Sequence, residues 1–374
     1  MVSLLPFIVK DLHLNLTIVG FLGASQGALG TLLAIPTGIL ASKIGGIKLI
    51  FISLIVYSIS ALGISISPHV ALLFLFFYLA AAGFAPFHIV GQSLTARFSE
   101  KGKLGRNMGS FTAIGEMGRI AIPAAALYIA TPIGWRLTYG SLATTGIILF
   151  LCVIYYLRTN KHIYHYKNGA IKQENSKDWM KQLLFMLREK KLTLVLLTST
   201  IDNLGSNAVY IFIPFLLLAK GIPTTNLAFF MGAFFVGTFI GKSFLGRSVD
   251  TYGPAKVFIF AEYCMALLLI LLTFANFYVF LILLVFILGL FTRGTTPVMA
   301  ALTSHISHEA HYEKAYTLTE FFGGISAILS SILLGVVADR FGITYSFYLS
   351  ASFAVAATIP IFFYLQSTHS EESN

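Results

Sequence analysis

A few ionisable residues stand inside long apolar stretches of the sequence, where charge is rare. Most of the 15 acidic residues lie between apolar runs or at their ends, but Asp202, Glu116, Glu262 and Glu320 lie within them, as do Arg119 and Arg293. A charge near the centre of a bilayer costs at least about 2.5–3.5 kcal/mol on insertion scales, so it is retained where it binds an ion or a solute. We therefore take these residues, apart from Glu262, as candidates for binding substrate or protons.

Asp202 is the strongest candidate for proton coupling. It lies about ten residues into an apolar run, which is close to mid-membrane at a rise of about 1.5 Å per residue. The residues after it include Asn203, Ser206 and Asn207, a polar stretch that is unusual for a lipid-facing helix. We expect Asp202, with Asn203 beside it, to bind and release a proton. The alternative is a structural aspartate that accepts hydrogen bonds within the fold.

The other candidates each allow two interpretations. Glu116 and Arg119 are three residues apart and therefore share one face of a helix, with the acid before the base. They predict either an internal ion pair or a site for substrate or proton. Arg293 predicts either a contact with an anionic substrate or a partner that neutralises Glu320.

No motif for catalysis or metal binding is present in the sequence. His305, His308 and His311 cluster with Glu309 and Glu313, but their spacing matches no defined zinc site. The sequence also has no phosphate-cradling loop, nucleophile elbow or HExxH helix. We predict that the chain is not an enzyme, that it holds no metal or cofactor, and that it does not drive transport with ATP by itself.

The composition predicts a membrane protein with many helices. The chain is 57% hydrophobic and 11% charged, with a mean hydropathy of +0.83, whereas soluble domains are about one quarter charged. Apolar runs of about 20 residues, enough to cross a bilayer, predict eleven complete spans. They are 17–41, 47–66, 70–96, 107–131, 135–157, 192–218, 225–247, 255–275, 277–303, 314–338 and 343–366.

The distribution of Lys and Arg predicts the orientation of these spans. Basic residues gather in cytoplasmic loops, and one set of loops, including the connector 158–191, holds nearly all of them. The opposite loops carry only Lys10, Arg136, Lys220 and Arg340. We therefore expect the connector and the C-terminus to be cytoplasmic, in the inner (plasma) membrane. The net charge of +10 then reflects topology, and we expect no nucleic-acid partner.

The sequence repeats itself at a constant offset of 208 residues. Pro6, Gly38, Gly45 and Lys48 recur as Pro214, Gly246, Gly253 and Lys256. A duplicated bundle in a membrane chain is typical of secondary transporters. The predicted organisation is an N-terminal half (1–157), a connector (158–191), a C-terminal half (192–366) and a tail (367–374). Because Pro6 matches Pro214 near the end of a span, most of the first helix is expected to lie before Met1. Either the start codon is assigned too late, which is our hypothesis, or the chain has lost a helix.

The connector contains one stretch that predicts a helix. Trp179, Leu183, Leu184 and Leu187 recur at helical spacing, opposite several basic residues. This pattern predicts either an amphipathic helix at the cytoplasmic interface or a solvated linker helix.

One loop motif occurs in both copies of the repeat. The second copy reads Gly246-Arg-Ser-Val-Asp250-Thr-Tyr-Gly253-Pro-Ala-Lys256, and the first reads Gly38-Ile-Leu-Ala-Ser42-Lys-Ile-Gly45-Gly-Ile-Lys48. This resembles the loop pattern of the major facilitator superfamily, and with the duplication the resemblance covers essentially the whole chain. It implies an all-α membrane fold of two pseudo-symmetric six-helix halves. It also implies that Gly246, Asp250 and Gly253 latch the cytoplasmic side, while Ser42 weakens the equivalent loop at Gly38 and Gly45.

The same resemblance implies a function. Phe87-His88 and the basic stretch 101–106 are loosely similar to fosmidomycin-resistance-type exporters. We expect a secondary transporter, acting as a monomer on a small-molecule substrate by alternating access, with proton-coupled efflux of a drug or metabolite as the first choice. Uptake of an organic anion or other nutrient by proton symport, or a receptor that no longer transports, are the alternatives. In this fold the helix that carries Glu262 is usually peripheral, which favours a structural role for that residue.

Overall fold

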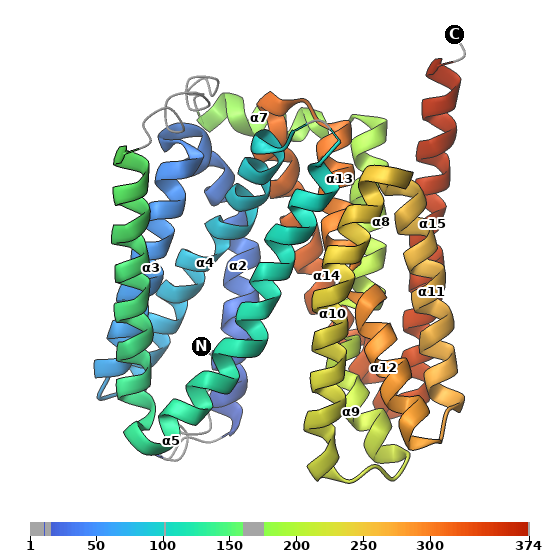
Figure 1. Cartoon of the computed structure of the whole chain (residues 1–374). Coiled ribbons are helices and arrows are strands. Elements are labelled where there is room, and N and C mark those ends of the chain that lie inside the picture. The colour runs from blue at the N-terminus through green and yellow to red at the C-terminus, as the bar shows by residue number, and fades with distance from the viewer. Residues whose placement is uncertain (1–10, 12–15, 101, 160–175, 373–374) are drawn as a thin grey trace. The chain divides into compact units, whose positions relative to one another are not determined.

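The protein is helical throughout the part that the structure describes. The computed structural model describes residues 11, 16–100, 102–159 and 176–372, and within these it does not describe some side chains, among them those of 16–28 and 116–132. Figure 1 shows its helices. The first half holds α2 (Leu16–Ile44), α3 (Gly46–Ile66), α4 (Val70–Phe98) and α5 (Leu104–Thr159), followed by α7 (Ser176–Met186).

The second half contains eight α-helices and one short 3-10 helix. They are α8 (Lys190–Ser206), α9 (Val209–Ala219), α10 (Thr224–Tyr252), α11 (Pro254–Phe274), α12 (Tyr278–Thr292), α13 (Thr295–Ile306), η2 (Glu309–His311), α14 (Tyr312–Phe341) and α15 (Ile343–Glu372).

The helix boundaries repeat with the offset found in the sequence. Shifted by 208, the bounds of α2, α3 and α4 become 224–252, 254–274 and 278–306, which are the bounds of α10, α11 and the α12–α13 pair. The turns repeat as well, since Gly45 and Gly253 have φ of 89° and 82°, a region that favours glycine. Gly134, with φ 80°, bends α5 at the place where Gly342 ends α14. The duplication is therefore structural.

Most of the predicted spans coincide with helices that could cross a membrane. Nine helices in the described residues are long and apolar enough. The predicted spans 17–41 and 107–131 coincide with α2 and the first part of α5, where some side chains are not described. The predicted remnant of a first helix, residues 1–9, lies outside the described residues.

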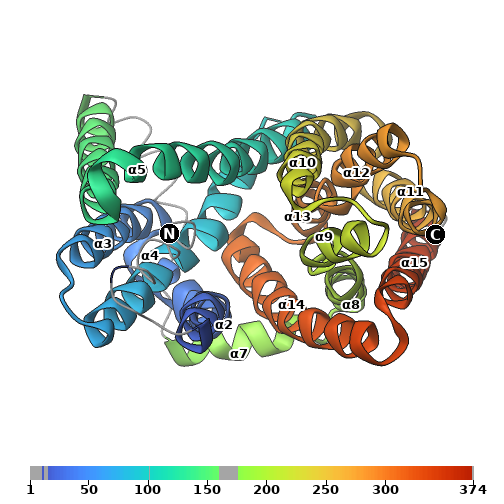
Figure 2. The ribbon, with the colours of Figure 1, turned by 90° about the horizontal axis from the view of Figure 1, so that it is seen from below.

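The chain forms two compact units, and each is described here separately. Unit 1 comprises Met1–Leu94 and Ala121–Leu183, and unit 2 comprises Thr95–Ile120 and Leu184–Asn374. Unit 2 therefore includes the end of α4 and the first part of α5. Seen from below, α8 and α9 lie in the middle of this unit, and α14 and α15 pack against α8 (Figure 2).

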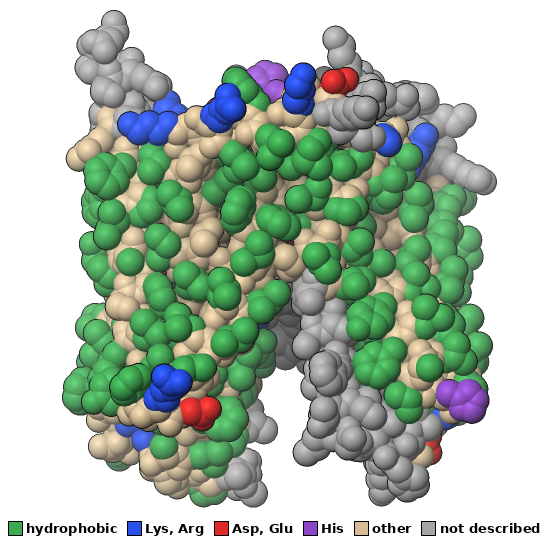
Figure 3. Space-filling view, turned by 180° about the vertical axis from the view of Figure 1, so that it is seen from behind, with side chains coloured by type: hydrophobic (Ala, Val, Ile, Leu, Met, Phe, Trp, Pro, Cys, Tyr) green, Lys and Arg blue, Asp and Glu red, His purple; other side chains and the backbone are tan. Residues whose placement is uncertain are grey.

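The surface of the helices is apolar where a membrane would cover it. Large hydrophobic side chains such as Phe244, Leu267 and Ile332 are more than half exposed. Figure 3 shows hydrophobic side chains over the middle of one face, with Lys and Arg at its edges. A soluble protein rarely exposes a continuous apolar area of this kind, so the chain is a multi-pass membrane protein.

The predicted connector helix forms as α7, but with a narrow apolar face. Trp179 and Leu183 are buried, whereas Leu184 is 58% exposed and Leu187 lies beyond the end of the helix. Of the four residues expected to form the apolar face, only Trp179 and Leu183 are thus buried on the helix.

Candidate polar site and cytoplasmic latch

Two of the spans in unit 2 are interrupted. One break separates α8 from α9 at Asn207 and Ala208, and the other separates α12 from α13 at Arg293 and Gly294. A broken helix leaves backbone groups that can bind a ligand, which is how many secondary transporters build their substrate sites. The breaks therefore mark a candidate site in this half.

A side-chain contact joins the two breaks. The guanidinium carbon of Arg293 lies 4.9 Å from the centre of the Tyr210 ring on α9. Such a cation–π contact contributes about 0.5–2 kcal/mol, depending on how dry it is. Both residues are half-buried, so the cation is held near the breaks while part of it stays accessible.

Asn203 and Asn207 line the same region of α8. The Asn203 amide donates to the carbonyl oxygen of Ser199 at 2.7 Å, and the Asn207 amide donates to Oδ1 of Asn203 at 3.2 Å. Asn203 also faces Gly323 of α14, where an added Cβ would lie 3.5 Å from its amide nitrogen. Glu320 is half-buried one turn before Gly323, and residues three apart share a helix face. We name Asn203, Asn207, Tyr210, Arg293 and Glu320 the polar surface.

Asp202 does not belong to the polar surface. Its side chain is 5% exposed, whereas Asn203 beside it is half-buried. Adjacent helical residues point about 100° apart, so Asp202 is turned into the interior of unit 2 when Asn203 faces α14. Sequence reasoning placed the two residues together, and the helix separates them.

Two further predicted site residues cannot be placed. The side chains of Glu116 and Arg119 lie outside the described residues. Their ion pair or substrate role therefore remains a prediction.

At the end of unit 2 that the sequence predicts to be cytoplasmic, Asp250 caps a helix from the first half of the sequence. Its carboxylate oxygens accept hydrogen bonds from the backbone N–H groups of Gly105 and Arg106, at 2.7 and 2.8 Å. These donors are in the first turn of α5, where no intrahelical acceptor exists and the dipole favours an anion. In the first copy Ser42 instead donates to the Ile39 carbonyl of its own helix.

Glycines allow this approach of α5 to α10. A Cβ on Gly105 would lie 2.3 Å from the Gly246 carbonyl oxygen, and one on Gly246 would lie 2.7 Å from the Cα of Gly109. The prediction did not include Gly105 and Gly109. Their spacing, a glycine at each end of a five-residue segment, is the signal that marks close helix contacts in membranes.

Replacing Asp250 with alanine is expected to destabilise this contact. The substitution leaves two N–H groups of α5 without acceptors, and loss of a comparable helix cap costs about 0.5–2 kcal/mol. Asp250→Asn keeps one acceptor oxygen, so this variant should lose less stability than Asp250→Ala. Thermal unfolding of the purified protein checks this order, and Asp339→Asn, at an exposed helix end, is the control. Equal melting temperatures for all variants would contradict the capping role.

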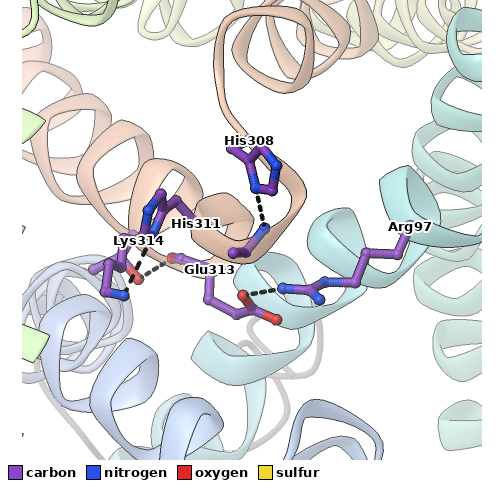
Figure 4. Close-up of polar contacts among 7 residues, drawn as sticks. Arg97, His308, His311, Glu313 and Lys314 are labelled. Carbon is purple, nitrogen blue, oxygen red and sulfur yellow. Dashed lines mark hydrogen bonds and ion pairs between the residues drawn. The ribbon is translucent and has the colours of Figure 1, made fainter. Parts of the chain in front are cut away.

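A buried ion pair lies close to this end of the fold. Nη2 of Arg97, at the end of α4, is 2.5 Å from Oε2 of Glu313 in the first turn of α14, and both side chains are at least 93% buried. Figure 4 shows the pair beside the loop that carries His308 and His311. The sequence placed Glu313 beside the histidine cluster and gave no sign of its pairing with Arg97. In the described residues no group of three or more His, Cys, Asp or Glu side chains is placed to hold a metal.

Comparison with known proteins identifies the fold. The model of the Major Facilitator Superfamily matches residues 1–215 and, again, 194–374. The chain belongs to the Major Facilitator Superfamily. The two overlapping matches correspond to the two copies of the repeat. Members of this superfamily are membrane transporters, so the chain is a transporter rather than an enzyme. Transporters of this superfamily bind small-molecule substrates and often protons.

Solved superfamily structures have the same fold. The fucose:proton symporter FucP of E. coli matches with a TM-score of 0.74 and 14% identity, over 97% of this chain and 94% of that one. FucP in the outward conformation reaches a TM-score of 0.77 at 16% identity, over 97% and 93%. The proton:xylose symporter XylE, bound to 6-bromo-6-deoxy-D-glucose, reaches 0.74 at 16% identity, over 96% and 89%. No curated protein sequence matches significantly. The expected likeness to drug exporters receives no support from these structures.

Proposed function

We propose that this superfamily member moves a small polar solute across the plasma membrane together with protons, by alternating access. The polar surface, which lies on the two broken helices and on α14, is the observation that carries the proposal. Arg293 offers a cation and the two asparagines offer hydrogen bonds, which suits a hydroxylated or anionic solute better than an apolar drug. This favours uptake by symport over the efflux expected from the sequence. FucP and XylE, which have the same fold, are both proton symporters, and this agrees with the proposal.

The test is solute-driven proton movement in reconstituted vesicles. Purified protein is placed in liposomes that hold a pH-sensitive dye, and sugars and organic anions are added outside one at a time. Symport predicts that an added solute carries protons inward and acidifies the lumen. Alkalinisation by an added solute would indicate antiport and efflux instead. Binding of a solute without any proton or solute movement would contradict transport and indicate a receptor.

Replacing Arg293 with methionine is expected to weaken binding of an anionic solute. If the guanidinium binds the anion, its loss removes a charge-assisted hydrogen bond of about 1.5–3 kcal/mol, or roughly a 10- to 100-fold rise in apparent KM. Initial rates in the same vesicles measure this, with Lys220→Met as a control because Lys220 caps the carbonyl groups of Thr273 and Ala275 at the far end of α11. An unchanged KM for every transported anion would exclude Arg293 from binding.

A further inference from the structure

Two carboxyl groups are buried inside unit 2, away from the polar surface. Asp202 on α8 is 5% exposed and Glu262 on α11 is fully buried. Asp202 accepts a hydrogen bond from the Ser206 side chain. Among the described residues, however, its Oδ1 and both carboxyl oxygens of Glu262 have no hydrogen-bond partner. An unpartnered buried carboxylate is among the most costly features a protein interior can have, so these groups require an explanation.

Both carboxyl groups lie where two apolar clusters meet. Along α11, along α15 and along the span formed by α8 and α9, one cluster ends and the next begins around this level. The first cluster contains Val195, Ala261 and Ala357, and the second contains Val209, Met265 and Ala354. Helix α15 packs against both α8 and α11. Measured along the helices, Asp202 and Glu262 are about 18 and 12 Å from the starts of α8 and α11, so both are at membrane depth.

The two acids lie within electrostatic range of each other. Besides its burial, Glu262 experiences the charge of Asp202. Away from the helix ends, the other titratable groups on the surrounding helices include Lys242 on α10, Tyr263 and Cys264 on α11, Arg293 and His305 around α13, Tyr316 and Glu320 on α14, and Tyr348 and Tyr364 on α15. Two like charges in a dry interior cannot both persist without a cation. A proton is the smallest cation that removes one of them.

We propose that Asp202 and Glu262 together bind a proton in the interior of unit 2, at a place separate from the polar surface. One carboxyl group then carries the proton and is neutral at neutral pH, which removes the repulsion between the two. Because Asp202 is adjacent to Asn203, loss of the proton would charge the inner face of the same turn of α8 that presents Asn203 to the solute. Proton binding does not depend on transport, but its use in coupling rests on the proposed function.

Infrared spectroscopy tests the proton site without transport. Purified protein in lipid nanodiscs at neutral pH should show the carbonyl-stretch band of protonated carboxyl groups. Part of this band is expected to disappear in the double variant Asp202→Asn/Glu262→Gln, whose amides match the neutral acids in size. Asp339→Asn, which removes an exposed carboxyl group of the same unit, should leave the band unchanged. An identical band in the wild type and the double variant, or no band in the wild type, would overturn the proposal.

The pH dependence of thermal unfolding provides a second measurement. If the folded protein holds a proton that the unfolded chain releases, stability falls as pH rises. The wild type and Asp339→Asn should therefore lose melting temperature as pH rises from about 4, where an unfolded carboxyl group gives up its proton, through neutral pH. The double variant should lose less melting temperature over the same range. Equal slopes for all three proteins would count against the site.

Transport separates this proposal from the proposed function. In the dye-loaded vesicles, the double variant is expected to bind solute but to lose solute-driven proton movement. A wild type that shows the infrared band but transports nothing would refute the proposed function and leave the proton site intact. A double variant that lacks the band and still couples solute to protons would refute the coupling role.

Discussion

Replacing Gly241 with valine is expected to prevent stable packing of α10 against α12. A Cβ at this position would lie 2.1 Å from the carbonyl oxygen of Leu290, and one at Gly237 would lie 2.0 Å from that of Phe286. A Cβ added to Gly289 on α12 would lie 2.1 Å from the carbonyl oxygen of Phe234 on α10. Because the obstructing atoms are backbone, they cannot rotate away, and the helices must separate. In a membrane such small-residue contacts hold helices together without help from a hydrophobic effect.

The expected loss of stability is large and has a control on the same helix. Overpacking of a tight interior costs about 1–3 kcal/mol, and a branched side chain against backbone should reach the upper end or exceed it. Gly232→Ala changes the same residue type on α10 at a position with open space around it, so it should leave stability unchanged or raise it slightly. Folded yield after size-exclusion chromatography and the melting temperature measure both variants. A Gly241→Val protein with the melting temperature of Gly232→Ala would contradict the packing.

Replacing Arg97 with methionine is expected to destabilise unit 2 at least as much. The substitution leaves the Glu313 carboxylate buried and without its ion-pair partner. Removing one partner of a buried pair typically costs 3–5 kcal/mol, because the remaining charge is not solvated. Arg97 also lies 5.9 Å from the centre of the Tyr312 ring, so the loss includes packing and a weak cation–π contact.

The double variant Arg97→Met/Glu313→Gln distinguishes charge from packing. If the uncompensated carboxylate is the main cost, the second substitution should restore much of the melting temperature. Lys103→Met is the matched control, because Lys103 forms an exposed ion pair with Glu100. That contact keeps the pKa of Glu100 below its usual value, but water screens an exposed pair and little stability is expected from it. Failure of Glu313→Gln to restore any stability in the Arg97→Met background would show that packing dominates.

The helices and their duplication were predictable because they depend on local composition. An apolar run of about 20 residues must form a helix in a bilayer, since its backbone groups have no other partners. The offset of 208 then predicts that the second copy has the same boundaries as the first, and the helices confirm this. The breaks at Asn207 and Arg293 were not predicted as breaks, although the polar residues around them were noticed.

The contacts of Asp250 and of Arg97 were predictable only in part. The loop motif identified Asp250 as one partner of the helix cap, because the residues of the motif follow one another in the chain. Its other partner, the first turn of α5, lies 144 and 145 residues away. Arg97 and Glu313 are separated by 216 residues in the chain. The sequence around either residue does not indicate the other. A contact between such distant residues follows from helix packing, which no local pattern records.

The sequence alone was sufficient to predict the membrane setting, the two repeated bundles and the short list of charges at membrane depth. These depend on hydrophobicity and on spacing along the chain. Which way each charge points depends on helix rotation and neighbours, and the fold decided it. Tertiary packing turned Asn203 toward α14 and Asp202 toward the interior, and it buried Glu262, which the sequence assigned to a structural role, where the charge of Asp202 acts on it. Burial without partners is a property of three-dimensional surroundings, and it makes these two carboxyl groups a proton site worth testing.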